Sequence, residues 1–179
     1  HSIELVKEAK KLNVQGTLIV TPYYVKPNAE GLFEHYRAIA ATVSFPIMAY
    51  HVPSRTGLNL GFEAFAELSK ISEVVGIKDA TGNLVFASEL MERVGDRFCY
   101  FSGDDATTFP FLCLGGQGVI SVISNVLPGA MVSLTRSCRE GQLAVAREQH
   151  YNILPLALWL FTQSNPIPVK AALWLMGEI

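Results

Sequence analysis

The feature that most constrains the fold of this chain is a regular alternation of short apolar segments with helical patterns. Five runs rich in β-branched and aromatic residues begin 21 to 29 residues apart, and a helical pattern separates each run from the next. This spacing is typical of βα units, in which each helix carries the chain back so that the next strand runs parallel to the last. The sequence therefore predicts a parallel sheet. The expected strands are residues 17–20, 45–50, 74–78, 98–101 and 119–122.

Two features favour a (β/α)₈ TIM barrel over an open doubly wound sheet. The glycine-rich run at residues 115–118 precedes a strand, whereas a dinucleotide-binding turn follows one. Polar side chains instead follow the strands, and a barrel gathers such side chains at one rim. We therefore expect an α/β fold in which about five C-terminal βα units of a barrel are present. The polar groups are Tyr23 and Tyr24, Tyr50 and Arg55, Lys78 and Thr81, and Ser102, Asp104 and Asp105.

The number of strands and the helical end of the chain predict a partial barrel followed by a helical region. Five strands are fewer than eight, and a barrel of this type has about 250 residues, so we expect about three N-terminal units to precede His1. The chain becomes wholly helical beyond the last strand, with more helix than an eighth unit needs. We expect a partial barrel over residues 1–140 and a C-terminal helical region over residues 141–179.

Composition argues against several classes of partner. Charged residues are 17% of the chain, the net charge is -2 and there is no basic block, which argues against binding to nucleic acid or an acidic membrane. Residues 106–135 carry no charge, but glycines and prolines interrupt them too often for a membrane helix. The three cysteines show no C-x-x-C spacing, which favours reduced thiols. We expect a cytoplasmic protein without a disulfide or zinc site.

Lys78 is the first candidate for chemistry. It ends the apolar run Val74-Val75-Gly76-Ile77, and burial there would lower the pKa of its amine toward neutrality. A neutral amine attacks a carbonyl and forms a Schiff base. The alternative is that Lys78 lies in the loop after the strand as a solvated charge.

Tyr50 ends the preceding strand, so it is expected beside Lys78. Neighbouring strands lie about 4.8 Å apart, and alternation places Gly76 on the same face as Lys78, where it would leave open space beneath the lysine. A phenol beside an amine relays protons while an imine forms. An ordinary aromatic residue at the barrel rim is the alternative interpretation of Tyr50.

Arg55 lies in the loop that follows Tyr50, between Pro53 and Gly57. Its guanidinium can bind a substrate carboxylate through two hydrogen bonds, and the alternative is a surface ion pair. Asp104 and Asp105 could suggest a metal, but no histidine cluster accompanies them and aspartate favours helix N-caps.

The histidines show no shared ligand spacing, so each is expected to have a satisfied or exposed structural role. They are His35, His51 and His150.

Six segments together resemble the dihydrodipicolinate synthase (4-hydroxy-tetrahydrodipicolinate synthase) family. The resemblance covers nearly the whole chain and corresponds to roughly the C-terminal two-thirds of the family barrel with most of its helical tail. The segments are Thr21-Pro22-Tyr23-Tyr24, Tyr50-His51-Val52-Pro53-Ser54-Arg55-Thr56-Gly57, Gly76-Ile77-Lys78-Asp79-Ala80-Thr81-Gly82, Ser102-Gly103-Asp104-Asp105, Gly118-Val119-Ile120-Ser121-Val122 and Asn165-Pro166-Ile167-Pro168-Val169-Lys170.

The resemblance implies a class I aldolase-type lyase of lysine and diaminopimelate biosynthesis that needs no cofactor and no metal. By that likeness Lys78 forms the imine with pyruvate, Tyr50 transfers protons, and Arg55 holds the carboxylate of aspartate semialdehyde. Gly103 and Ile120 would line the site. The expected product is 4-hydroxy-tetrahydrodipicolinate.

The resemblance also implies a homo-oligomer, a dimer of dimers. Tyr24 matches a tyrosine that reaches into the neighbouring subunit's site to complete a proton relay, whose threonine lies upstream of His1. Lysine is a possible effector, with Tyr23 near its site. His51 departs from the asparagine common in the family, and we expect this change to be tolerated.

Two other functions remain open from the sequence. The related N-acetylneuraminate lyases share the tyrosine and the lysine, so a retro-aldol lyase for a sugar acid or another 2-keto acid is one alternative; Arg55, within Pro53-Ser54-Arg55-Thr56-Gly57, favours the synthase. The other is a truncated, non-catalytic barrel that only binds a ligand or another subunit.

Overall fold

The computed structural model describes residues 1–179, which form two compact units, residues 1–101 and 102–179. This division by contacts differs from the expected division after residue 140, which stays a prediction. The first unit contains α1 (Ser2–Lys11), β1 (Thr17–Val20), α2 (Ala29–Val43), β2 (Ile47–His51), α3 (Pro53–Thr56), α4 (Phe62–Leu68), β3 (Val74–Asp79), α5 (Leu84–Val94), the 3₁₀ helix η1 (Gly95–Arg97) and most of β4 (Cys99–Ser102).

The five strands are hydrogen-bonded in sequence order, β1-β2-β3-β4-β5, as the alternation predicts. β1 pairs with β2 in parallel, and β2 pairs with β3 in parallel. The second register places Tyr50 opposite Lys78 and His51 opposite Asp79. The candidate pair therefore lies on neighbouring strands, at the ends where loops follow.

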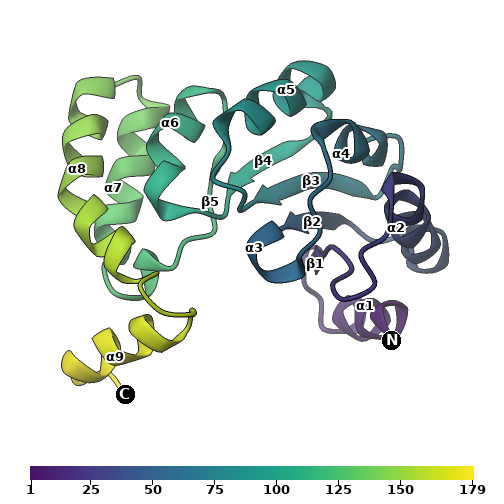
Figure 1. Cartoon of the computed structure of the whole chain (residues 1–179), viewed down its shortest axis with the longest axis horizontal. Helices are drawn as coiled ribbons and strands as arrows, with labels where there is room; N and C mark the ends of the chain where they lie inside the picture. Colours follow the sequence, from purple (N-terminus) through teal and green to yellow (C-terminus); the bar gives the residue numbers. More distant parts are fainter. The chain divides into compact units, whose positions relative to one another are not determined.

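The helices of the first unit pack against one another along the strands (Figure 1). Their buried faces carry large apolar side chains, because a helix beside a sheet must remove one stripe from water. Asn28 begins α2 and Asn83 begins α5, each with its side chain accepting a backbone N–H of the first turn. Residues buried by at least 98% include Leu32, Tyr36, Ile39, Ile47, Phe65, Leu68 and Ile77.

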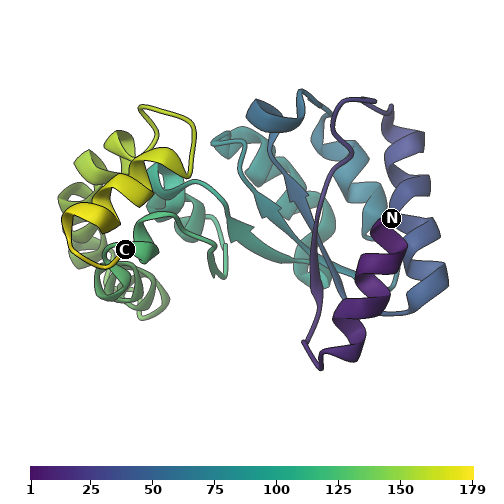
Figure 2. The same ribbon diagram turned by 90° about the horizontal axis from the view of Figure 1, so that it is seen from below.

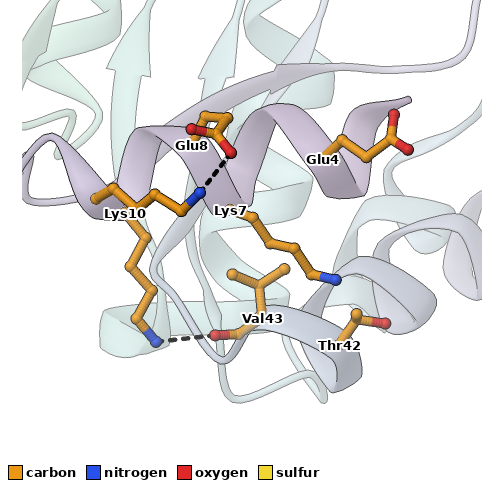
Figure 3. A pocket seen from close by; sticks show the side chains of 7 residues that line it. Glu4, Lys7, Glu8, Lys10, Thr42 and Val43 are labelled. Carbon is orange, nitrogen blue, oxygen red and sulfur yellow. Dashed lines mark hydrogen bonds and ion pairs between the residues drawn. The ribbon is translucent and has the colours of Figure 1, made fainter.

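α1 lies alongside α2, as Figure 2 shows, and Lys10 joins the two helices. The Lys10 ammonium donates to the carbonyl oxygen of Val43 at 3.0 Å, at the end of α2 (Figure 3). It also donates to the Ser44 carbonyl at 3.2 Å. A cation there complements both the unpaired carbonyls and the negative end of the helix dipole. The hollow between these helices contains no predicted site residue.

The second unit begins with the last residue of β4 and is mainly helical. Its elements are η2 (Asp105–Thr107), α6 (Thr108–Cys113), β5 (Gly118–Val119), η3 (Ile123–Asn125), α7 (Pro128–Arg139), α8 (Leu143–Trp159) and α9 (Ile167–Leu175). Ile123, Met131, Leu134 and Leu160 are central members of its apolar core. α7 packs against α8 and α6, in agreement with the expected helical end (Figure 1).

β5 is shorter than the expected strand at residues 119–122. The backbone N–H groups of Val122 and Ile123 donate to Asp105 Oδ2 at 2.8 and 3.0 Å, so they leave the ladder and the chain turns into η3. A carboxylate that bonds directly to the backbone competes with strand pairing. No helix in the protein is both long enough and apolar enough to span a bilayer.

Candidate active site

Lys78 and Tyr50 face each other across β2 and β3. The Lys78 ammonium nitrogen lies 4.2 Å from the centroid of the Tyr50 ring. This is within the range of about 6 Å in which a cation interacts with an aromatic face. Both side chains are half-buried, so they combine access to solvent with a partly apolar environment. The strand register, predicted from the spacing of the sequence, is what brings them together.

The residues next to this pair hold the ends of the strands. Asp79 is buried, and its Oδ1 accepts the Thr81 N–H at 2.8 Å, which fixes the turn after Lys78. The Ala80 N–H donates to the His51 carbonyl at 2.9 Å and extends the pairing of β2 with β3 beyond Lys78. Asp79 is not among the predicted site residues, although an aspartate two residues before a threonine after a strand is a signal for such a turn.

Gly76 does not leave open space beneath Lys78, so that expectation is wrong. A Cβ on Gly76 would overlap the Cys99 carbonyl oxygen and lie 3.1 Å from the Cys99 Cβ. The glycine is needed because the backbone of β4 approaches β3 closely at this point. The close approach of β4 to β3 beside Lys78 therefore requires that residue 76 has no side chain.

The ionisation of Tyr50 is controlled by burial and by Arg55. Burial raises the pKa of the Tyr50 phenol, and the nearby Arg55 charge lowers it by a smaller amount. The phenol is therefore protonated at neutral pH and can donate a proton. This electrostatic effect shows that Arg55 belongs to the surroundings of Tyr50.

Arg55 lies in α3, a short helix that the sequence did not predict. Pro53 occupies the start of α3, and Gly57 ends it with φ 66°, in the left-handed region. The Thr56 hydroxyl donates to the Val52 carbonyl at 3.1 Å and accepts the Leu58 N–H at 3.2 Å. These contacts fix the loop while the Arg55 side chain stays exposed.

Tyr24 points away from the body of the first unit. Its side chain is 90% exposed, and its backbone is in the left-handed region with φ 67°. Left-handed backbone is uncommon for a tyrosine. A side chain so exposed has few contacts within its own chain. The flanking Tyr23 and Val25 are exposed as well.

Gly103 and Ile120 both lie in the second unit, near the ends of β4 and β5. The Ile120 N–H donates to the Ser102 carbonyl at 2.8 Å, so the two strand ends are joined there. Asp104 caps η2 through Ala106, as expected. Asp105 has a different role from the expected cap, since it binds the backbone beyond β5. The substrate-lining role of Gly103 and Ile120 stays a prediction.

Two of the three histidines differ from the expectation of a satisfied or exposed structural role. His51 is 1% exposed and packs against the rings of Phe65 and Phe86, yet its Nδ1 has no hydrogen-bond partner. His150 is also buried with an unpartnered Nδ1. Each is therefore neither exposed nor fully satisfied. No group of three or more His, Cys, Asp or Glu side chains is arranged to hold a metal ion.

Comparisons with known proteins agree with this arrangement. The family model described as the dihydrodipicolinate synthetase family matches residues 1–179. The 4-hydroxy-tetrahydrodipicolinate synthase of Nitratidesulfovibrio vulgaris (strain DSM 19637 / Miyazaki F) is 50% identical over 180 residues, which are 100% of this chain and 62% of that protein. The chain thus spans about three fifths of the length of the curated relatives it matches.

Two solved structures extend the likeness to three dimensions. The chloride-inhibited dihydrodipicolinate synthase of Acinetobacter baumannii, complexed with pyruvate, superimposes with a TM-score of 0.97 at 42% identity, covering 99% of this chain and 61% of that one. The enzyme of Cyanidioschyzon merolae with lysine bound gives a TM-score of 0.93 at 38% identity, covering 99% and 60%.

These matches confirm the expected fold, because the strands and helices correspond to part of the barrel and to the helices that follow it. The resemblance that the six segments carried is confirmed as well. The family model matches every residue of this chain, and a curated relative is 50% identical to the chain. This chain therefore belongs to the dihydrodipicolinate synthetase family.

Proposed function

We propose that this chain carries the Schiff-base chemistry of a 4-hydroxy-tetrahydrodipicolinate synthase, which condenses pyruvate with L-aspartate semialdehyde. The observation that carries the proposal is the contact of the Lys78 ammonium with the Tyr50 ring at 4.2 Å on neighbouring parallel strands. The pyruvate complex of the Acinetobacter baumannii relative supports the choice of keto acid.

The reaction starts with the neutral Lys78 amine. Its nitrogen attacks the ketone carbon of pyruvate, and loss of water from the carbinolamine gives the imine. Removal of a methyl proton gives an enamine, whose carbon attacks the aldehyde. The amino group of the second substrate then displaces Lys78 and closes the ring, which frees the enzyme. The protonated imine serves as the electron sink, so the chemistry needs no metal and no added cofactor.

Tyr50 transfers protons in these steps. Its pKa is raised, so the phenol keeps its proton at neutral pH and can donate it to the departing hydroxyl of the carbinolamine. The contact of the Tyr50 ring with the Lys78 nitrogen supports this role, because water is lost from the carbon bonded to that nitrogen.

Arg55 binds the carboxylate of aspartate semialdehyde. The exposed guanidinium stands on a loop fixed by Thr56 and Gly57, so it is held at the rim while remaining accessible. A planar guanidinium matches a carboxylate with two parallel hydrogen bonds. Gly103 and Ile120 line the substrate site, and their places at the ends of β4 and β5 support this role.

Tyr24 acts in the site of a second copy of the chain. Its 90% exposure and left-handed backbone support this, since an exposed aromatic side chain on a constrained loop gains burial when a partner covers it. The assembly is a homo-oligomer, a dimer of dimers, working in the cytoplasm. Lysine is a possible effector, and the lysine-bound relative of Cyanidioschyzon merolae supports that.

Covalent trapping tests the proposal directly. The complete protein is incubated with pyruvate and borohydride, which reduces an imine to a stable amine, and its peptides are analysed by mass spectrometry. We expect one reduced pyruvate adduct, on the peptide that contains Lys78. Lys70 is the matched control, because its ammonium is exposed and paired with Glu67 on the surface. An active preparation with Lys78 unmodified would overturn the proposal.

A second measurement separates this function from cleavage of a sugar acid. The complete protein is assayed for the cyclic product from pyruvate and aspartate semialdehyde. Arg55→Ala is expected to raise the KM for aspartate semialdehyde while Lys78 is still trapped by pyruvate. An unchanged KM would favour another aldehyde or keto acid as the substrate.

A further inference from the structure

The loop after β1 folds back over the loop that carries Arg55. Gly57 ends α3 with φ 66°, and a Cβ built on it would lie 2.9 Å from Lys26 Cε and 3.2 Å from Lys26 Nζ. The end of the Lys26 side chain therefore lies against the backbone of Gly57, two residues after Arg55. Tyr24 of the same loop is 90% exposed, so the loop directs one side chain away from its own chain and the other toward the Arg55 loop.

The backbone of this loop is held in an uncommon conformation that directs Lys26. Lys26 has φ 43° and Tyr24 has φ 67°, both in the left-handed region. Left-handed backbone is uncommon for these residue types, and strained residues concentrate at functional sites. The Val25 N–H donates to the Tyr23 carbonyl at 2.8 Å, and Pro27 follows Lys26, so the turn is constrained on both sides. The direction of the Lys26 side chain is therefore fixed by its own loop.

The loops at this end of the sheet carry positive charge and no acidic side chain. Residues 21–28, 52–61 and 80–83 follow β1, β2 and β3, and their charged side chains are Lys26 and Arg55. A local excess of one sign of charge raises the concentration of ligands of the opposite sign. An anion that reaches this rim therefore meets two cations and no carboxylate from the three loops.

Lys26 differs from several paired cations on the surface of the same unit. Lys11, Arg37 and Lys70 each form an ion pair with a glutamate three residues earlier in the sequence. The exposed Lys26 ammonium has three N–H donors and forms no ion pair with a carboxylate of this chain. These donors are available to a ligand beside the Arg55 loop.

We propose that Lys26 shares with Arg55 the binding of the carboxylate of aspartate semialdehyde. This inference rests on the proposed function and assigns a further substrate-binding residue to it. The planar Arg55 guanidinium matches the carboxylate with two hydrogen bonds, and Lys26 adds a compact, mobile charge from the facing loop. An aldehyde without a carboxylate would leave both cations unpaired, so the two residues together select an acidic aldehyde.

Two other roles of Lys26 give different expectations. In the first, the methylene groups of Lys26 cover Gly57 and stiffen the Arg55 loop, which needs the apolar stem but not the charge. In the second, Lys26 is a solvated charge without a part in binding. Lys26→Met keeps most of the stem and removes the charge, whereas Lys26→Arg keeps the charge. The two variants together separate these roles from recognition of the carboxylate.

Steady-state kinetics of the complete protein at pH 7.5 tests the proposal. Lys26→Met should raise the KM for aspartate semialdehyde about three- to tenfold, the effect of one exposed charge on a carboxylate, with kcat changed less than about twofold. Lys26→Arg should keep the KM within about twofold of the unchanged protein. The KM for pyruvate should rise less, because pyruvate is bonded to Lys78 at the end of β3. Lys70→Met is the matched control, since it removes an exposed charge that is paired with Glu67.

The dependence of the KM on ionic strength is the second measurement. Added salt screens exposed charges, so the KM for aspartate semialdehyde should rise less steeply with salt in Lys26→Met than in the unchanged protein. An unchanged KM in Lys26→Met, an equal rise for both substrates or in Lys70→Met, a raised KM in Lys26→Arg, or an equal salt dependence would each overturn the inference. If the unchanged protein forms no cyclic product, the proposed function itself fails, which is a separate result.

Discussion

The two faces of β2 and β3 differ sharply at the same level of the sheet. Tyr50 and Lys78 form a half-buried pair on one face, whereas His51 and Asp79 are buried on the other. A step of one residue along each strand therefore takes the side chain from a partly solvated environment to a buried one. The difference teaches that the candidate reactive groups lie on the face that solvent reaches, while the residues of the opposite face are buried and help to fix the strand register.

The largest expected effect is on the open face. Lys78→Ala removes the nucleophile, so kcat should fall by about 10⁴-fold or more, as for loss of a covalent catalyst elsewhere. The folded state should persist, because the half-buried Lys78 contributes little to the core. Circular dichroism and steady-state turnover measured on one preparation check both statements. Substantial turnover in the variant would contradict the division of roles between the two faces.

Tyr50→Phe is expected to have the next largest effect. It keeps the ring against Lys78 but removes the hydroxyl, so kcat should fall by about 10²–10⁴-fold, the usual contribution of a proton-transferring group. The melting temperature should change little. Stopped-flow measurement of imine formation with pyruvate separates this effect from substrate binding. If imine formation is as fast as in the parent, the phenol has another role.

Gly76→Ala tests the spacing between β3 and β4. The new methyl group would collide with the Cys99 carbonyl, so the backbones must separate, at a cost of about 1–3 kcal/mol of unfolding free energy. Gly129→Ala in α7 is the matched control, because a Cβ there meets nothing within 4 Å and alanine favours helix. Urea denaturation should distinguish the two variants, and equal stability would show that β4 moves freely.

His51 should make stability depend on pH. Its pKa is about 4 in the folded protein, below the ordinary 6.5, so the unfolded chain takes up the proton first as pH falls. Stability is therefore full above about pH 6.5 and declines between that pH and about pH 4. Linkage gives a loss of about 2 kcal/mol at pH 5. His51→Phe should remove that loss when urea midpoints at pH 7.5 and 5 are compared, and an identical decline in the variant would assign it to other groups.

The smallest expected effect is a shift in the pH profile of Tyr50. The Arg55 charge lowers the pKa of the phenol, in opposition to burial. Arg55→Ala should therefore move the fall in activity at alkaline pH to higher pH. The profile of kcat/KM checks this direction, and a shift to lower pH would show that Arg55 does not act on the phenol.

Much of the open face could be predicted from the sequence. The spacing of the strands placed Tyr50 beside Lys78, and the structure confirms that pairing. Gly76 was misjudged because the absence of a side chain does not tell whether the neighbouring backbone fills the space. The role of Asp105 was also missed, since its partners Val122 and Ile123 lie beyond the next helix and strand.

The sequence by itself determined the order of strands and helices, the parallel direction of the first three strands and the identity of the candidate nucleophile. These follow from periodicity, which local residue choice encodes. Only the tertiary structure decided that β4 closes over Gly76, that α3 fixes the Arg55 loop, and that His51 is buried. Such features depend on contacts between segments that are far apart in the sequence, and a local sequence pattern does not determine how close those segments come in space.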